Sequence, residues 1–393
     1  MAAQPEASEA IVRARDLGLN FDGEPGTLNA ITDIPGLEVG YQTIISGSGA
    51  LDAGRGPIRT GVTAILPRGR AGVGVSCSAA TYSFNGNGEL TGRSWIDESG
   101  SLTMPIALSN SHAVGACHQG IDQWVHQNRP DLSNRWLLPV VGETWDGYLN
   151  DINGGHVTPE LTAAAIDAAT SGPLAEGSVG GGTGMNCYGF KGGSGTASRR
   201  VDFGGQRYHV AAFIQANFGS RSELRLDGLP LGRLSKTPNP MQQSNWLHID
   251  DERARVPGGA GSAIVVIATD APLLPNQCAA LARRAPLGMA RTGTTGGHFS
   301  GDIILAFSTA NPGQLNSEFP QAETEPHKAQ LEFIPWGHID PFYQACVETV
   351  EESIANALIA AQDMTGRDDH FSPGLPHHEV LEAVRARNSV GQE

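Results

Sequence analysis

The chain has 393 residues, of which 51 are glycine and 24 are proline, while hydrophobic residues make up 39% and charged residues 17%. This hydrophobic content is sufficient for a full core, so the glycine excess belongs to folded structure and not to a disordered linker, and the lack of a triplet register excludes collagen. The formal net charge of -15 argues against a general affinity for nucleic acid, because phosphate groups must be neutralised by clustered Lys and Arg.

Short runs that are rich in β-branched residues and bounded by Gly or Pro predict strands. They lie at 61–66, 72–80, 137–142, 208–216, 263–269 and 303–308. The spacing of apolar residues predicts helices at about 113–127, 159–170, 273–286 and 341–363. Because some strands follow one another without a helix between them, the pattern favours a layered α/β or α+β sandwich over regular βαβ winding.

Residues 220–260 interrupt this pattern with a polar, proline-containing segment that has no sustained period. A loop of this length inside a compact domain is usually functional or disordered. It ends abruptly at 257–262 (PGGAGS), directly before the buried-strand run AIVVIA. We therefore expect a special role for this junction.

The cysteine and histidine patterns predict no metal or disulfide framework. No CxxC pair occurs among the widely spaced cysteines Cys77, Cys117, Cys187, Cys278 and Cys346, and no HExxH motif is present. His377 and His378 lie in a polar tail, where we expect them to be solvated. Residues 1–20 lack the apolar region of a secretory signal, and the longest apolar run, 263–268, is too short to span a bilayer. A soluble, cytoplasmic protein is the expectation.

Familiar catalytic motifs do not explain the chain. The glycine-rich stretch 177–195 fits neither a P-loop, since Lys191 stands between Phe190 and Gly192, nor the dinucleotide pattern GxGxxG. Tight turns and close backbone approaches are the simpler interpretation of its glycines. A GxSxG elbow is absent, and the acids Glu143, Asp146 and Asp151 could serve a glycosidase or hold an ammonium group.

The junction Gly261-Ser262 has the layout of a self-processing N-terminal nucleophile. Gly261 carries no side chain to hinder attack by the Ser262 hydroxyl on its carbonyl, and the preceding glycines allow the geometry of an N-to-O acyl shift. Cleavage would free the α-amino group of Ser262, whose reference pKa of about 7.7 to 8.0 suits a general base. By itself, however, Gly-Ser before a strand is common and indicates only a loop that ends in a strand.

Several segments read together resemble one known family, the self-cleaving aminopeptidases that include the L-aminopeptidase/D-alanine esterase-amidase and the β-aminopeptidases. The resemblance covers roughly residues 15–365. It is carried by DIPGLEVGYQT (33–43), GVTAILPRG (61–69), SNSHAVG (109–115), GETWDGYLNDINGGHVT (142–158), GSVGGGTGMNCYGFKGG (177–193), IQANFGS (214–220), GAGSAIVVIATDAPLLPNQ (259–277) and SGDIILAFSTAN (300–311).

The resemblance implies a four-layer αββα sandwich like that of N-terminal nucleophile hydrolases, formed as a single large domain by residues 1–393. It also implies self-cleavage between Gly261 and Ser262 into chains 1–261 and 262–393, which assemble as tetramers of cleaved pairs. No metal or organic cofactor is implied.

By the same resemblance, Ser262 is the nucleophile and its freed amine is the base. Ser300 and Asp302 orient them, Asn217 is the side-chain donor of the oxyanion hole, and Glu143 pairs with the substrate ammonium. Some members carry a Tyr as a second oxyanion donor near the place of Trp145, and here both Trp145 and Tyr148 are candidates.

The sequence thus predicts a serine aminopeptidase that acts on short peptides, amides or esters with a free amino group. Asp302, where β-aminopeptidases tend to have Glu, favours the L-aminopeptidase/D-esterase type. A β-aminopeptidase, and an amidase or acyltransferase of the same fold, stay open as alternatives. So does a non-catalytic, glycine-rich protein that binds small ligands and uses the long loop as a lid.

Overall fold

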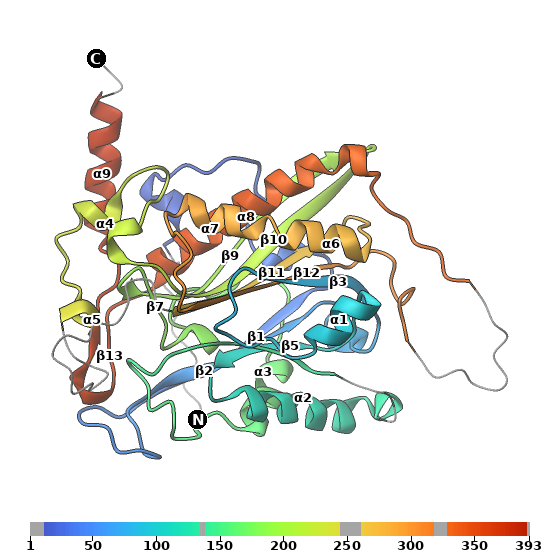
Figure 1. Cartoon of the computed structure of the whole chain (residues 1–393), viewed down its shortest axis with the longest axis horizontal. Coiled ribbons are helices and arrows are strands. Elements are labelled where there is room, and N and C mark those ends of the chain that lie inside the picture. The colour runs from blue at the N-terminus through green and yellow to red at the C-terminus, as the bar shows by residue number, and fades with distance from the viewer. Residues whose placement is uncertain (1–11, 134, 136–137, 244–260, 318–327, 391–393) are drawn as a thin grey trace, which may run out of the picture.

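The computed structural model describes residues 12–133, 135, 138–243, 261–317 and 328–390. Within these residues, two large β-sheets are stacked face to face (Figure 1). One sheet has the strand order β1-β2-β5-β6, with β1 (Glu38–Ser46), β2 (Ile58–Leu66), β5 (Ile106–Asn110) and β6 (Val140–Thr144). The other has the order β4-β3-β12-β11-β10-β9, with β3 (Cys77–Ser83), β4 (Ser101–Leu102), β9 (Gly193–Phe203), β10 (Gln206–Asn217), β11 (Gly261–Thr269) and β12 (Ser300–Ser308).

Helices cover the outer face of each sheet. α6 (Pro275–Ala282), α7 (Ala285–Arg291) and α8 (Asp340–Ala360) lie over the sheet that contains β9 to β12, and α2 (Val114–Asn128) and α3 (Pro159–Asp167) lie over the other sheet (Figure 1). The other α-helices among the described residues are α1 (Arg93–Ser99), α4 (Leu231–Leu234), α5 (Pro240–Gln243) and α9 (His377–Val390). Short ribbons are formed by β7 (Asn186–Cys187) with β8 (Phe190–Lys191), and by β13 (Met364–Thr365) with β14 (Phe371–Ser372).

Three apolar clusters fill the spaces between these layers. Ile65 and Leu108 meet Phe213 and Ile264 between the two sheets. A second cluster joins the β9 to β12 sheet to α6, α7 and α8, and a third joins β2 and β5 to α2 and α3. Because each sheet buries both faces, its strands can be continuously apolar, as the run Ala263 to Ala268 in β11 is. The described residues therefore form the predicted αββα sandwich.

Several predicted elements need correction at their ends. The strand expected at 72–80 begins only at Cys77, because Gly74 has a φ of +92°, which ends extended backbone. The helix expected over 273–286 divides into α6 and α7, since Pro286 is tolerated only in the first turn of the second helix. The expected strand 137–142 begins at Val140 and continues to Thr144, while position 137 is outside the described residues.

The segments that were expected to be irregular are partly helical. Residues 220–243 contain α4 and α5, and 244–260 lie outside the described residues. His377 opens α9 and is partly buried, with its Nε2 2.9 Å from the carbonyl of Ile359, whereas His378 is exposed as expected. Edge strands β1 and β9 were missed because glycine and polar residues interrupt them and leave no apolar run, although most of β9 is buried.

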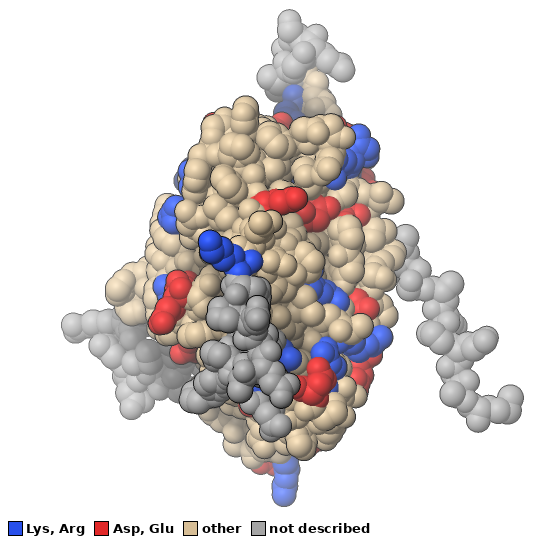
Figure 2. All heavy atoms as spheres, turned by 90° about the vertical axis from the view of Figure 1, so that its right-hand side faces the viewer, with Lys and Arg blue, Asp and Glu red and all other residues tan. Residues whose placement is uncertain are grey.

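Charged side chains are mixed on the face in Figure 2, where Lys and Arg are interspersed with Asp and Glu. The described helices include none that combines the length and apolar character needed to cross a membrane.

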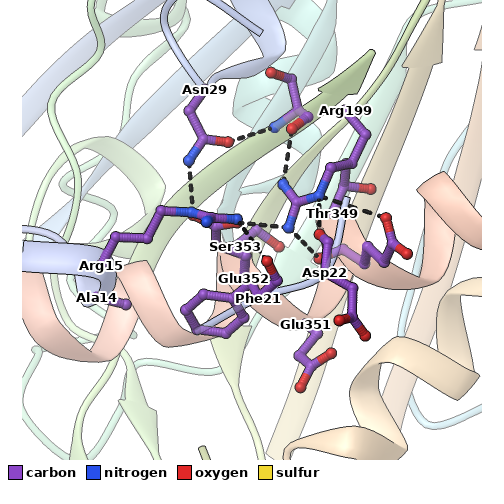
Figure 3. A network of polar contacts seen from close by, with 12 residues as sticks. Ala14, Arg15, Phe21, Asp22, Asn29, Arg199, Thr349, Glu351, Glu352 and Ser353 are labelled. Carbon is purple, nitrogen blue, oxygen red and sulfur yellow. Dashed lines mark hydrogen bonds and ion pairs between the residues drawn. The ribbon is translucent and has the colours of Figure 1, made fainter. Parts of the chain in front are cut away.

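A buried ionic network ties the N-terminal segment to α8 and β9 (Figure 3). Glu352 of α8 accepts from Arg199 at 2.6 Å and from Arg15 at 2.7 Å, and Asn29 donates to the same carboxylate at 2.6 Å. Burial alone would raise the pKa of Glu352, but the hydrogen bond from Arg15 and the charges of Arg199 and Arg15 outweigh it, so the pKa is lowered. The network is therefore held together as ions.

We expect Glu352→Ala to lower the free energy of unfolding by about 3–5 kcal/mol, because it leaves the buried Arg199 guanidinium without its nearest carboxylate. Urea unfolding followed by fluorescence measures the change. Asp202→Ala is the matched control, since it removes the acid of an exposed pair with Arg207, and little change is expected there. Equal unfolding midpoints for Glu352→Ala and wild type would contradict the importance of the network.

Candidate active site

The register of three central strands brings the predicted nucleophile and its partners to one place. β11 is parallel to β12, with Gly261 opposite Ser300 and Ser262 opposite Gly301. β10 is antiparallel to β11 on its other side, with Asn217 opposite Ser262. Residues that are far apart in the chain therefore meet at the same end of the sheet.

Ser262 is only 2% exposed, and its hydroxyl faces the other sheet. The Oγ accepts from the backbone N–H of Trp145, which follows the end of β6, at 3.3 Å. The carbonyl of Trp145 accepts from Nδ2 of Asn217 at 2.9 Å. The backbone of Trp145 thus links Ser262 to Asn217.

The amide of Asn217 has a defined orientation. Its Oδ1 accepts from the backbone N–H of Asn186 at 2.8 Å, while its Nδ2 donates to the carbonyl of Trp145. Because one partner can only donate and the other can only accept, the two ends of the amide cannot be exchanged. Its donor end therefore lies on the side of Trp145 and Ser262.

Ser300 and Asp302 lie next to Ser262 on β12 and contact each other. The Ser300 Oγ donates to Oδ1 of Asp302 at 2.7 Å, and Nδ2 of Asn85 donates to Oδ2 at 3.0 Å. Burial raises the pKa of Asp302, while the hydrogen bonds from Ser300, Asn85 and the backbone of Ala263 oppose that shift. The carboxyl group is thus buried close to the residue that follows Ser262.

Glu143 lies near the end of β6, two residues before Trp145, and is 7% exposed. Its Oε1 accepts from the backbone N–H of Glu89 at 2.9 Å, and the Ser111 hydroxyl donates to its Oε2. Burial raises the pKa of Glu143, and the hydrogen bonds from Ser111 and Glu89 oppose the shift.

Residues 84–89 connect the two carboxylates of the site. Asn85 holds Asp302, the N–H of Glu89 holds Glu143, and Gly88 lies against Gly301. A Cβ on Gly301 would lie 2.1 Å from the carbonyl of Asn87, so only glycine fits at this crossing. Sequence reasoning missed Asn85, because the loop that contains it gives no signal beyond turn residues. Ser111 was also missed, although it stands in the SNSHAVG block.

Gly261 is needed for close packing as well. A Cβ on Gly261 would lie 2.0 Å from the carbonyl of Asn217. The glycine before Ser262 therefore lets β11 approach the end of β10, and places the carbonyl of residue 261 beside the nucleophile.

Tyr148 occupies a different environment from Trp145. It is buried, its hydroxyl donates to the carbonyl of Phe371 at 3.1 Å, and its ring stacks on His370 with centroids 4.7 Å apart. Trp145 reaches Ser262 through its backbone N–H, a donor that does not depend on its side chain.

Two buried titratable groups, Asp146 and Lys191, are close to the site, since Asp146 follows Trp145 in the chain and Lys191 pairs with Asn186 across β7 and β8. Burial raises the pKa of Asp146 to about 7, against hydrogen bonds from Thr60 and Asn150, and lowers the pKa of Lys191 to about 7, against the charge of Asp146. Among the described residues, no group of three or more His, Cys, Asp or Glu side chains is arranged to hold a metal ion.

Comparison with known proteins relates this arrangement to one family. Residues 29–372 match the model of peptidase family S58. The chain belongs to that family. Its relatives include two proteins named beta-peptidyl aminopeptidase BapA. The one from Sphingosinicella microcystinivorans is 44% identical over 369 residues, 94% of this chain and 90% of the relative, and the one from Sphingosinicella xenopeptidilytica is 43% identical over 384 residues, 97% and 93%.

Solved structures of aminopeptidases share the fold. The L-aminopeptidase D-Ala-esterase/amidase from Ochrobactrum anthropi, described as a prototype for the serine aminopeptidases and a variant of the Ntn hydrolase fold, is 42% identical with a TM-score of 0.85. The match covers 96% of this chain and 99% of that one. A Burkholderia sp. beta-aminopeptidase is 42% identical with a TM-score of 0.84, over 95% and 99%.

The S58 chain is therefore a serine aminopeptidase with an Ntn-hydrolase type of fold, which confirms the resemblance identified from its sequence blocks. The alternative of a non-catalytic ligand-binding protein is set aside.

Proposed function

We propose that this S58 aminopeptidase matures by cutting itself between Gly261 and Ser262 into chains 1–261 and 262–393. In this step the Ser262 hydroxyl attacks the Gly261 carbonyl, its proton passes to the departing nitrogen, and an ester replaces the peptide bond. Water then hydrolyses the ester and leaves a carboxylate on Gly261 and a free amine on Ser262. The observation that carries the proposal is the position of Ser262, between Asn217 on one strand and Gly301 on the other, with its Oγ at the Trp145 N–H.

In the mature enzyme, the freed amine of Ser262 takes the proton of the Ser262 hydroxyl, and the oxygen attacks the substrate carbonyl. The Nδ2 of Asn217 and the backbone N–H of Trp145 stabilise the oxyanion, since Asn217 pairs with Ser262 across β10 and β11 and the Trp145 N–H donates to the Ser262 Oγ. The leaving amine or alcohol takes the proton, an acyl-enzyme forms on Ser262, and water hydrolyses it. Ser300 and Asp302 orient the amine, and Glu143, with Ser111, receives the substrate ammonium.

The substrate class that we propose is short peptides, amides and esters with a free amino group, of the L-aminopeptidase/D-esterase type. Asp302, in place of a longer Glu, supports this choice. A β-aminopeptidase is the second candidate, and it is favoured by the names of the relatives that are 44% and 43% identical. If the same site acts as an amidase or acyltransferase, transfer of the acyl group to an added acceptor is expected to be faster than its hydrolysis.

Two measurements test this proposal. Denaturing mass spectrometry of the purified protein is expected to give the two chains, and a single active chain of 41.2 kDa would overturn self-processing. A panel of L-, D- and β-aminoacyl nitroanilides then ranks kcat/KM by substrate class. A clear preference for β-aminoacyl compounds would replace the L-aminopeptidase assignment with the second candidate.

The proposal also includes a cytoplasmic location and assembly into tetramers of cleaved pairs. The five cysteines, all free and buried, are compatible with a reducing compartment. Mass determination by light scattering tests the assembly.

A further inference from the structure

Lys191 is a fully buried lysine, 0% exposed, in a chain whose other lysines are Lys236 and Lys328. Within the described residues, its ammonium donates to backbone carbonyls and not to a carboxylate. The acceptors are the carbonyls of Met185 and Gly192, each at 2.8 Å, and of Gly182 at 3.4 Å. Burying a charge is costly, and an apolar side chain of similar volume would fill the same space without that cost. We therefore expect Lys191 to have a role other than packing.

The carbonyl of Met185 and the N–H of Asn186 belong to the same peptide group. Because this group is planar, fixing the direction of its oxygen also fixes the direction of its N–H. Lys191 and the backbone N–H of Gly192, also at 2.8 Å, hold the oxygen. The N–H on the other side donates to Oδ1 of Asn217 at 2.8 Å.

The surrounding hairpin restrains the same peptide. β7 and β8 pair Asn186 with Lys191, and the backbone N–H of Tyr188 donates to the carbonyl of Phe218, next to Asn217, at 2.7 Å. Lys191 therefore lies at the open end of the β7–β8 hairpin. On the other strand of this hairpin, Asn186 contacts the amide of Asn217. A chain of contacts runs from the Lys191 ammonium through peptide 185–186 and Asn217 to the backbone of Trp145 and to Ser262.

We propose that Lys191 is a positioning residue for the oxyanion donor Asn217, acting through the peptide group between Met185 and Asn186. The inference rests on the proposed role of Asn217. A donor on the carbonyl also polarises the peptide and strengthens its N–H as a donor to Oδ1. Lys191 does not touch substrate, so its effect reaches the reaction only through Asn217.

The test compares Lys191→Met, Asn217→Ala and the double variant in the full chain, with Arg199→Met as a control that removes another buried cation. Activity is expressed per mature Ser262 chain, counted by denaturing mass spectrometry. Lys191→Met is expected to lower kcat by about 10-fold with KM little changed, a part of the roughly 100-fold to 1,000-fold that loss of an oxyanion donor costs. The double variant is expected to match Asn217→Ala alone, and Arg199→Met to keep kcat even where it lowers stability.

The outcomes separate the two proposals. Wild-type kcat in Asn217→Ala would refute the oxyanion role of Asn217 itself. A large loss in Asn217→Ala, combined with wild-type kcat in Lys191→Met or with losses that multiply in the double variant, would overturn only the role of Lys191. If Lys191→Met does not cut itself, a crystal structure of the uncut variant decides. A hydrogen bond from Asn186 to Asn217 that has lengthened beyond about 3.5 Å supports the inference, and an unchanged one overturns it.

Discussion

Replacing Ser262 by Ala is expected to leave one uncut chain of 41.2 kDa without aminopeptidase activity. The substitution removes the only atom proposed to attack both the Gly261 carbonyl and the substrate carbonyl. Its structural cost is small, because the buried side chain gives up one acceptor of the Trp145 N–H at 3.3 Å. Denaturing mass spectrometry and hydrolysis of an aminoacyl nitroanilide measure the two losses together.

Ser262→Cys is the matched variant, since it has nearly the same shape and keeps a nucleophile in the same place. Ser262→Cys is expected to retain some self-cleavage and Ser262→Ala none, while both variants unfold at the same temperature. Formation of the same two chains by Ser262→Ala would assign the nucleophile of self-cleavage to another residue. Activity that persists in a folded, uncut Ser262→Ala protein would do the same for the aminopeptidase reaction.

The strands that carry the site could be predicted because they are buried on both faces. β10, β11 and β12 contain apolar runs that leave a clear trace in the sequence, and the apolar spacing that predicted the helix at about 341–363 corresponds to buried residues of α8 such as Cys346, Val350 and Ile354. The ends of elements were less predictable, since they depend on the φ of Gly74 or on the place of Pro286 in a helix turn.

The contacts between distant segments could not be derived from the sequence. Asn217, Ser262 and Ser300 are neighbours only because β11 pairs with both β10 and β12 in a particular register. Family resemblance supplied those residues, but it did not supply Asn85, which reaches Asp302 from the end of β3. Lys191 was visible in the sequence only as a lysine that does not fit a P-loop.

The glycine excess has a specific meaning at the site. At Gly261 and at Gly301, the backbone of another segment occupies the space that a Cβ atom would need. The composition alone could not locate these close approaches, because a glycine that allows a turn and a glycine that allows close approach are identical in a sequence.

Glu143→Ala is expected to raise KM for substrates with a free amino group by about 10-fold to 100-fold, the value of a charge-assisted hydrogen bond of about 1.5–3 kcal/mol. N-acetylated esters of the same amino acids carry no ammonium, so their KM is expected to change little. Glu143→Gln is the closer control, because it keeps the size of the side chain and its contact with Ser111 while it removes the charge. Equal changes for free and blocked substrates would exclude Glu143 from ammonium binding.

The pH dependence gives an independent reading of the same residue. Burial raises the pKa of Glu143 above its ordinary value, so the carboxylate is charged above that raised pKa and becomes neutral as the pH falls through it. KM for free-amine substrates is therefore expected to rise on the acid side at a higher pH than an ordinary glutamate would give.

The proposed base, the amine of Ser262, is also protonated on acidification, but the resulting loss of activity is the same for free and blocked substrates. The ratio of kcat/KM between the two substrates cancels that loss and isolates Glu143, and in Glu143→Gln the ratio is expected to become flat on the acid side. A ratio that keeps its acid-side fall in Glu143→Gln would place the titrating group elsewhere.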